Sequence, residues 1–290
     1  MGAVPLVTVM TDEIFREGLS IAPIESLSIP SKHELGMLEH VDAQIIISGP
    51  TDPETFRAVS PERIQAYREG GVPIIEIEKR RKIRTVQLHL GKVTPERAER
   101  YNIDYDTWWS VMIEALDIDY QGLSRFGKAL AKKLEKGRTM HIKTEEGTDI
   151  TFEIGRASIV IDDGIINDDD LAHGRIVTNL PAGIIDVSPI KGTAKGSVFV
   201  NTPQFRIGQK IVNTVMRFKH GTLAEIKAEK NIESLHETFE RICLSEPVLN
   251  RVGFGLNPKM KSSFLFDEII LGNVSVATGG EVHLVLFRVL

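Results

Sequence analysis

Few residues of this 290-residue chain stand at spacings that would do chemistry by themselves. The eight histidines are scattered, and none belongs to a His-Glu-x-x-His sequence or another local zinc-binding pattern. The chain has neither a Gly-x-Ser-x-Gly nucleophile elbow nor a Walker phosphate-binding loop. Gly253 and Gly255 are spaced like part of a dinucleotide-binding loop but lack its third glycine. Local motifs therefore assign no reaction.

Two further groups contain metal-binding or nucleophilic residue types. The acidic run 168–170, together with His173, could offer oxygen and nitrogen ligands to a metal, although acidic runs between strands more often form solvated turns. Cys243 is the only cysteine, so no intrachain disulfide can form. Its position at the end of an expected helix favours a small buried hydrophobe over a nucleophile.

The composition is that of an ordinary globular protein without a strong charge bias. Apolar residues make up 42% and charged residues 26% of the chain. Lys and Arg total 35 against 40 Asp and Glu, a net charge of −5, so we expect no nucleic-acid partner. No run of ~18 apolar residues is present to span a membrane, and the N-terminus lacks the basic region of a signal peptide. These features predict a cytoplasmic protein without a membrane partner.

The first part of the sequence alternates strand and helix signals. Residues 43–47 form a short apolar run that predicts a buried parallel strand. Ser60 and Pro61 then open a helix as its N-cap and first residue. Gly70-Gly71 is expected to end this helix, and residues 72–77 predict the next strand. The result is a strand–helix–strand unit.

The hydrophobic period changes near Gly137. Before it, Thr94-Pro95 repeats the helix-start signal, and residues 123–134 have the apolar spacing of another helix. After it, residues 141–154 predict a β-hairpin with alternating faces. Further strands are expected at 158–161, 197–200, 207–218, 223–228 and 282–289. One helix is expected at 231–243.

These signals predict an α/β (α+β) fold with two regions. Residues 1–137 would form a small αβ N-terminal region that contains the strand–helix–strand unit. Residues 138–290 would form a mixed, strand-rich domain.

Two glycine-rich blocks, residues 179–189 and 251–258, could each be a tight loop that needs glycine for a positive φ. Together with Gly147-Thr148-Asp149, Asp163-Gly164 and Phe266-Asp267-Glu268, in this order, they resemble the M29 family of metallo-aminopeptidases. The same fold is used by a metal-dependent dihydroxypyridine ring-opening dioxygenase. The likeness covers roughly residues 40–290 and is closer after residue 137. It implies a truncated, strand-rich M29-like domain and a homodimer.

The resemblance also implies where the family's metal ligands would stand. They are two glutamates, a histidine and a His-x-Asp pair. The matching motifs put Ile184 and Arg251 at the glutamate positions and Ser275 at the histidine position. His283 keeps the histidine of the pair, while Val285 replaces its aspartate. Isoleucine and valine offer no donor atom and arginine repels a cation, so we expect no metal, no other cofactor and no catalytic residue.

Three functions from different classes stay open. We favour a non-catalytic peptide-binding protein that keeps the old substrate cleft, similar to the peptide-binding proteins of some ribosomal-peptide natural-product pathways. A second is a metal-dependent aminopeptidase or ring-cleaving dioxygenase with relocated ligands. A third is a structural homo-oligomeric subunit. The relocated ligands would be Asp168, Asp170, His173 and His283.

Arg251 is central to the expected peptide site. Its planar, permanently charged guanidinium can hold a peptide carboxylate through two hydrogen bonds, with Lys191 and Lys259 on the same rim. An internal salt bridge from Arg251 to Asp186 or Glu281 explains the same residue equally well, so both interpretations stay open. The predicted binding residues are Arg251, Lys191, Lys259, Ser275, His283 and Asp186.

Overall fold

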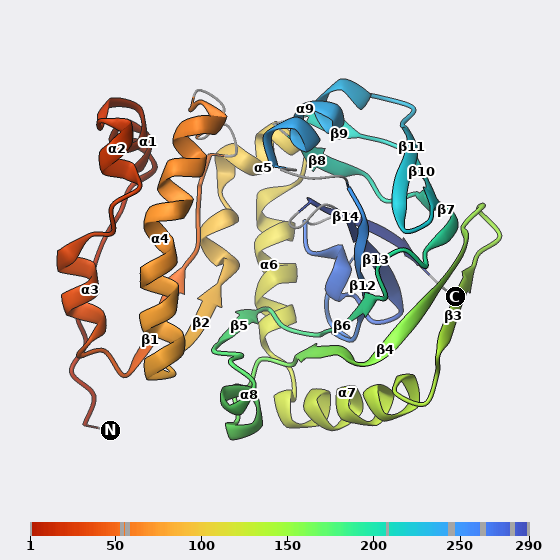
Figure 1. Ribbon diagram of the computed structural model, residues 1–290, viewed down its shortest axis with the longest axis horizontal. Coiled ribbons are helices and arrows are strands. Elements are labelled where there is room, and N and C mark those ends of the chain that lie inside the picture. Colours follow the sequence, from red (N-terminus) through yellow and green to blue (C-terminus); the bar gives the residue numbers. More distant parts are fainter. Residues whose placement is uncertain are drawn as a thin grey trace.

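A computed structural model gives the arrangement of the chain. It describes all residues except 1, 53–54, 56–58, 207–208, 243–246, 262–264, 279–281 and 289–290, and the side chains of 156–158, 206, 241–242 and 282–288. Figure 1 shows α1–α4 at one end of the molecule and an antiparallel sheet at the other. The early elements are α1 (Asp12–Ile21), α2 (Ile24–Leu27), α3 (Lys32–Leu38), β1 (Ala43–Ile47), α4 (Pro61–Arg81), β2 (Arg84–Leu88), η1 (His89–Lys92), α5 (Pro95–Tyr101), α6 (Tyr105–Leu116) and α7 (Tyr120–Leu134).

The later elements are mostly strands. They are β3 (Thr139–Lys143), β4 (Asp149–Asp162), α8 (Asp168–Ala172), β5 (Val177–Leu180), β6 (Ile184–Pro189), β7 (Lys195–Val200), β8 (Gln204–Arg206), β9 (Gln209–Ile211), β10 (Thr214–Lys219), β11 (Thr222–Lys227), α9 (Ile232–Ile242), β12 (Leu249–Gly255), η2 (Asp267–Ile269), β13 (Asn273–Thr278) and β14 (Val282–Arg288).

A small parallel sheet has the order β1-β2-β5. The predicted strand at 43–47 and its parallel pairing are confirmed, but its burial was predicted wrongly. Helix α4 covers one face, where Gln44 Nε2 donates to Glu78 Oε1 at 2.7 Å. On the other face Ile45 is 78% and Ile47 68% exposed. Parallel sheets are normally covered on both faces, but no second layer covers this sheet in the described part of the chain.

Helix α4 is longer than the sequence indicated. Ser60 caps it as predicted, its hydroxyl accepting from Arg63 N, but the helix runs through Gly70-Gly71 and ends only at Arg81. The strand predicted at 72–77 is therefore wrong, and β2 supplies the next strand. A Cβ at residue 70 would collide with the carbonyl oxygen of Leu27. Gly70 thus lets α2 approach α4 closely and does not stop the helix.

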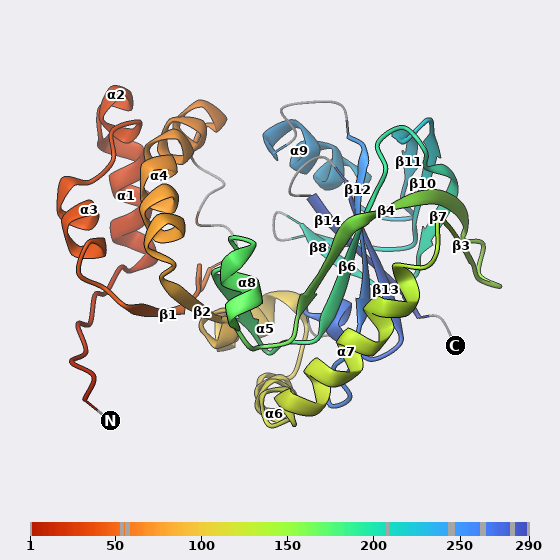
Figure 2. The same cartoon turned by 60° about the horizontal axis from the view of Figure 1, so that its bottom comes forward.

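The larger sheet is antiparallel, in the order β11-β10-β7-β4-β6-β12-β13-β14, with β3 paired to β4. Figure 2 shows that this sheet is curled and that α7 lies along it. The hairpin predicted at 141–154 is confirmed by β3 and β4, and residues 158–161 continue β4. One face of the sheet forms the main core, which includes Ile185, Val187, Val252, Val274 and Val276. The predicted α+β fold class is confirmed.

The two regions share elements. Strand β5 follows residue 137 in the chain, yet it pairs with β2 of the small sheet, Thr85 opposite Val177. Helix α6 buries Trp108 and Met112 in a second core that also contains Ile184 of β6. The face of the large sheet opposite its main core therefore lies toward α5 and α6.

Candidate functional site

The family's ligand positions fall on one face of four adjacent strands. Antiparallel registers pair Gly253 of β12 with Asp186 of β6 and with Ser275 of β13, and place Ile184 opposite Gly255. Directly opposite residues point to the same face of a sheet. Ser275 in turn pairs with Val285, and Ala277 pairs with both Arg251 and His283. The backbone thus aligns positions 184, 251, 275, 283 and 285 as the resemblance implies; the side chains of His283 and Val285 lie outside the described residues.

Gly253 is the floor of this site. A Cβ at residue 253 would collide with Ser275 Oγ and lie 2.7 Å from Ile184 Cδ1 and 3.0 Å from Asp186 Oδ1. Three side chains from the two strands that flank β12 therefore converge above one glycine. Ile184 is buried against α5 and α6, so an apolar group stands where the resemblance implies a metal-binding glutamate. The described residues do not fit a divalent metal, because Ile184 offers no donor, Arg251 pairs with Asp186, and the nearby Asp162 already accepts from Thr178 and Asn179.

Arg251 forms the internal salt bridge that the sequence left open. Its Nη1 lies 3.0 Å from Asp186 Oδ2, and the two side chains are 31% and 18% exposed. Burial raises the pKa of Asp186 to about 6; the guanidinium of Arg251 opposes this, and the carboxylate of Asp162 adds to it. The desolvation of the Asp186 carboxylate therefore raises its pKa by more than the ion pair with Arg251 lowers it. Asp186 Oδ1 has no hydrogen-bond partner among the described residues. Glu281, the other candidate partner, is outside them.

The two predicted rim lysines belong to other elements. Lys259 Nζ lies 3.0 Å from Asp117 Oδ2 and also donates to the Asp117 carbonyl, at the end of α6. It follows the Gly255 end of β12, whereas Arg251 stands at the other end, about 13 Å away along a strand. Lys191 is exposed in the turn between β6 and β7. The structure thus brings together Arg251, Asp186 and Ser275.

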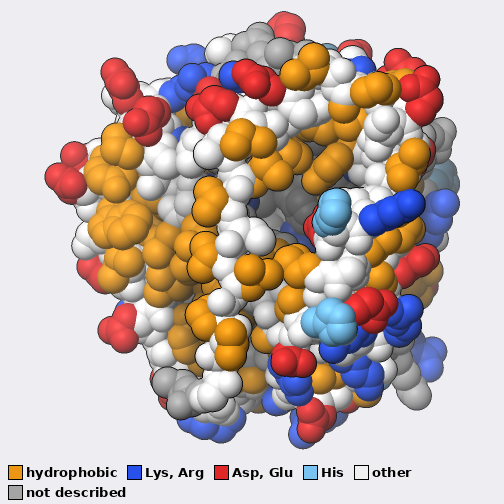
Figure 3. Space-filling model, turned by 90° about the vertical axis from the view of Figure 1, so that its left-hand side faces the viewer, with side chains coloured by type: hydrophobic (Ala, Val, Ile, Leu, Met, Phe, Trp, Pro, Cys, Tyr) orange, Lys and Arg blue, Asp and Glu red, His pale blue; other side chains and the backbone are white. Residues whose placement is uncertain are grey.

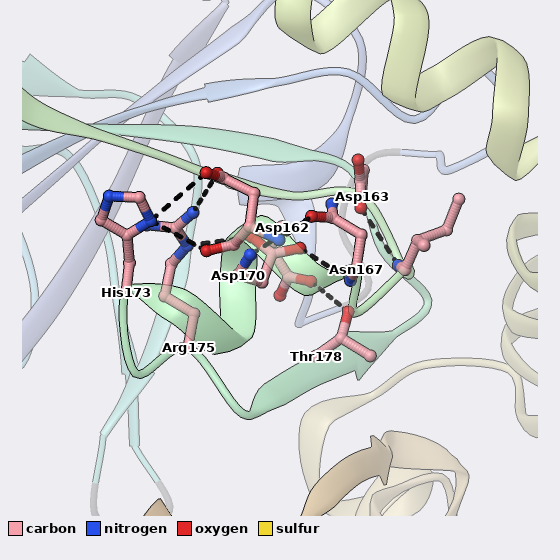
Figure 4. Close-up of polar contacts among 9 residues, drawn as sticks. Asp162, Asp163, Asn167, Asp170, His173, Arg175 and Thr178 are labelled. Carbon is pink, nitrogen blue, oxygen red and sulfur yellow. Dashed lines mark hydrogen bonds and ion pairs between the residues drawn. The ribbon is translucent and has the colours of Figure 1, made fainter. Parts of the chain in front are cut away.

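The acidic run forms the short helix α8 and not a turn (Figure 4). Asn167 caps it, and Asp170 Oδ2 accepts from Asn167 N at 3.0 Å. Asp170 Oδ1 and Asp169 Oδ2 pair with Arg175 at 2.9 and 3.1 Å. These carboxylates are thus satisfied by the chain itself. Among the residues described, no group of three or more His, Cys, Asp or Glu side chains is placed to hold a metal ion.

A polar network that the sequence reasoning missed leads to this site. Ser48 follows β1, His89 follows β2 and Asn179 lies in β5, so all three stand at the carboxyl ends of neighbouring parallel strands. Asn179 Nδ2 donates to Asp162 Oδ2 at 2.7 Å, and Asp162 pairs in register with Ile184. Ligand sites of open parallel sheets gather at such strand ends. That rule was the available signal for treating His89 as more than one scattered histidine.

Comparison with known proteins shows to which family this chain belongs. A profile described as thermophilic metalloprotease (M29) matches residues 1–241. The chain belongs to the M29 family. The match includes Ile184 but ends before Arg251. A search of curated proteins found no match. None of the described helices is long and apolar enough to cross a membrane.

Two solved structures share the M29 fold with this chain. Wild-type AmpT from Thermus thermophilus superimposes with a TM-score of 0.62 at 20% identity, over 94% of this chain and 73% of AmpT. A 2,5-dihydroxypyridine dioxygenase from Pseudomonas putida KT2440 gives 0.51 at 13% identity, over 87% and 85%. At these identities the likeness establishes the fold.

Proposed function

We propose that this M29 protein is a cytoplasmic peptide-binding protein that does not perform the metallopeptidase reaction. The observation that carries the proposal is the Arg251–Asp186 ion pair, beside buried Ile184, on the sheet face where the resemblance places the metal ligands. A water molecule needs a bound cation to become acidic near neutral pH. A fixed guanidinium at that place cannot supply this chemistry, although it can hold a carboxylate.

The proposed peptide site consists of Arg251, Asp186, Ser275 and His283, with Lys191 and Lys259 farther out. The guanidinium remains 31% exposed while its Nη1 holds Asp186. A peptide carboxylate or acidic side chain would compete with Asp186 for this cation. The raised pKa of Asp186 favours the exchange, because its carboxylate can take up a proton once the guanidinium turns to the ligand. Maturation of a peptide natural product is the setting that we propose for such a protein.

Calorimetry with tripeptides that carry either a free or an amidated carboxyl terminus tests the proposal. We expect binding of the free acids, weakened about ten- to hundredfold by Arg251→Ala, which corresponds to roughly 1.5–3 kcal/mol. Lys259→Ala is the matched control, because that lysine already pairs with Asp117. The proposal would be contradicted if Arg251→Ala and Lys259→Ala bound the free-acid tripeptides equally well. Hydrolysis of the peptides that depends on an added divalent metal would also contradict it.

A second candidate, a structural homo-oligomeric subunit, is favoured by the exposed apolar surface of the N-terminal region. Figure 3 shows hydrophobic side chains spread over the side of the molecule that carries α1–α4. We propose a homodimer in either case. Light scattering should then give twice the 32.3 kDa of one chain, and Ile45→Asp with Ile47→Asp should lower the mass if this surface is used. A 32.3 kDa particle at micromolar concentration would exclude both the dimer and the subunit function. The residues concerned include Val4, Leu6, Val7, Val9, Met10, Ile45 and Ile47.

A further inference from the structure

Three side chains at the edge of the small sheet are arranged as nucleophile, base and orienting group. Ser48 Oγ lies 2.7 Å from His89 Nδ1, and His89 Nε2 lies 3.0 Å from Asn179 Oδ1. In the sequence, His89 is 41 positions from Ser48 and 90 positions from Asn179. Only the fold brings them together. A hydroxyl, an imidazole and an amide in this order are the parts of an acyl-transfer triad.

The direction of each hydrogen bond follows from Asp162. A carboxylate can only accept, so the Asn179 amide nitrogen, 2.7 Å from Asp162 Oδ2, must face it. Asn179 Oδ1 therefore faces His89 and accepts the Nε2 proton. This leaves an unprotonated Nδ1 on His89, which accepts the Ser48 hydroxyl proton. Asp162 is itself fixed by Thr178 Oγ1 at 2.6 Å, the contact drawn in Figure 4.

The surroundings hold the pair in place. His89 stacks on Phe266 at a centroid distance of 5.2 Å. A Cβ at residue 91 would lie 2.7 Å from the Ser48 carbonyl oxygen, so Gly91 lets the turn that carries His89 approach Ser48. Both Ser48 and His89 are partly exposed. Burial, and then Lys92, lower the pKa of His89 to about 4, against the opposing effect of its hydrogen bond to Asn179. The imidazole is thus unprotonated, as a general base must be, at neutral pH.

We propose that Ser48 is the nucleophile of a metal-independent acyl-transfer site that accepts carboxylic esters and thioesters of small acyl groups. Ser48 Oγ bonds to the acyl carbon while its proton moves to His89 Nδ1. The bond from the acyl carbon to the leaving oxygen or sulfur breaks, and the leaving group takes that proton. Water then attacks the acyl carbon and gives a proton to His89 Nδ1. The bond from the acyl carbon to Ser48 Oγ breaks, Oγ takes that proton, and the carboxylic acid is released. Because His89 is a weak base, alcohols and thiols that leave easily are preferred to amines. Asn179 is a positioning residue.

Acetylation by p-nitrophenyl acetate tests the nucleophile. We expect a burst of nitrophenolate and a single acetyl group, mapped to Ser48 by peptide mass spectrometry. Ser48→Ala should abolish the burst, and Asn179→Ala should slow it about 10–100-fold. Ser20→Ala is the matched control, because Ser20 is an exposed serine whose hydroxyl donates to the Arg16 carbonyl. An acetyl group on another residue, or a burst retained by Ser48→Ala, would overturn the proposal.

A thiol substitution separates catalysis from a structural role. In a Cys243→Ala background, Ser48→Cys should be alkylated by iodoacetamide faster at neutral pH than Ser20→Cys, because the unprotonated His89 can accept the thiol proton as the sulfur reacts. The pH profile of alkylation of Ser20→Cys should be that of an ordinary thiol with a pKa of about 8.5. Adding Asn179→Ala to Ser48→Cys should move its profile toward that of the control. Identical profiles for Ser48→Cys and Ser20→Cys would show that the network only joins the two regions.

Discussion

Strands β1 and β13 have similar lengths but very different environments. In β13 all six residues, from Asn273 to Thr278, are buried. In β1 the aliphatic side chains Ile45 and Ile47 are mostly exposed. Strand β13 lies between β12 and β14 in a curled sheet, whereas β1 is the edge of a small sheet that, among the described elements, has a helix on one face (Figure 2). Burial is decided by how many layers surround a strand, and hydrophobicity alone does not reveal this.

The comparison separates two sources of stability. The large sheet is held by long-range contacts in one continuous core. The N-terminal region depends more on local signals, namely the capped starts of α1, α3, α4 and α5 at Thr11, Ser31, Ser60 and Thr94. We therefore expect substitutions in the sheet to cost much more than comparable ones in β1, and the following variants test this.

The largest loss is expected for Asn257→Ala, at the end of β12. This fully buried amide donates to the carbonyls of Ala115 and Ala182 at 3.0 and 2.8 Å and accepts from Lys259 N and Met260 N. Alanine would leave these buried groups unpaired, a loss of about 4 kcal/mol in the free energy of unfolding by urea. Asn257→Asp keeps the acceptor and should lose less. A loss below about 1 kcal/mol would show that water replaces the amide.

A matched pair of truncations addresses the comparison directly. Ile185→Ala in β6 should lower the free energy of unfolding by about 3 kcal/mol, because Ile185 is completely buried in the core. Ile45→Ala in β1 should change it by less than about 0.5 kcal/mol, because the side chain is 78% exposed. Similar losses in both variants would mean that β1 is covered in solution, for instance by a second chain.

Much of the fold was predictable from local sequence. Cap-then-proline signals at Ser60 and Thr94 located two helix starts, and alternating residues located the hairpin of β3 and β4. The failures have one physical cause. The Gly70-Gly71 pair has the appearance of a helix stop, but Gly70 serves a contact with α2 that lies 43 residues away in the chain (Leu27). Local patterns contain no information about such partners.

The candidate site was predictable only in part. Motif order located positions 184, 251 and 275, and the strand registers put them on one face. The choice between a free Arg251 and one paired with Asp186 needed the structure, because residues 65 apart had to meet. The network of Ser48, His89 and Asn179 was missed for the same reason. Each residue is unremarkable by itself, and the parallel pairing of β1, β2 and β5 brings them together.

The pH dependence of stability should reveal one titrating group in each region, with opposite signs. The pKa of Asp186 is raised to about 6, so the folded state binds its proton more tightly than the unfolded state. Its contribution is present below the unfolded pKa and is lost as pH rises toward 6. The pKa of His89 is lowered to about 4, so its contribution is lost as pH falls from 6.5 to 4. Each amounts to about 2 kcal/mol after allowance for solvent, and in the wild type they largely offset each other.

Single variants should expose the two opposing slopes. Relative to wild type, Asp186→Asn should gain stability as pH rises from about 4 to 6, because the unfavourable ionisation of Asp186 is removed. His89→Gln should lose stability relative to wild type as pH rises from about 4 to 6.5, because the contribution of His89 is missing. Urea unfolding at several pH values measures both differences. Parallel curves for all three proteins would mean that both groups titrate alike in the folded and unfolded chain.

The smallest effect tests the local stability of the N-terminal region. Ser60→Ala removes the hydroxyl that accepts from Arg63 N at the start of α4, and a lost N-cap costs about 1 kcal/mol. Ser60→Asp should retain the stability, since aspartate caps a helix equally well and its charge suits the helix N-terminus. Amide hydrogen exchange locates the loss: the first turn of α4 should exchange faster while β12 and β13 stay protected. If exchange rises equally in the large sheet, α4 and the sheet unfold as one unit, and the distinction between a locally stabilised region and a core-stabilised one does not hold.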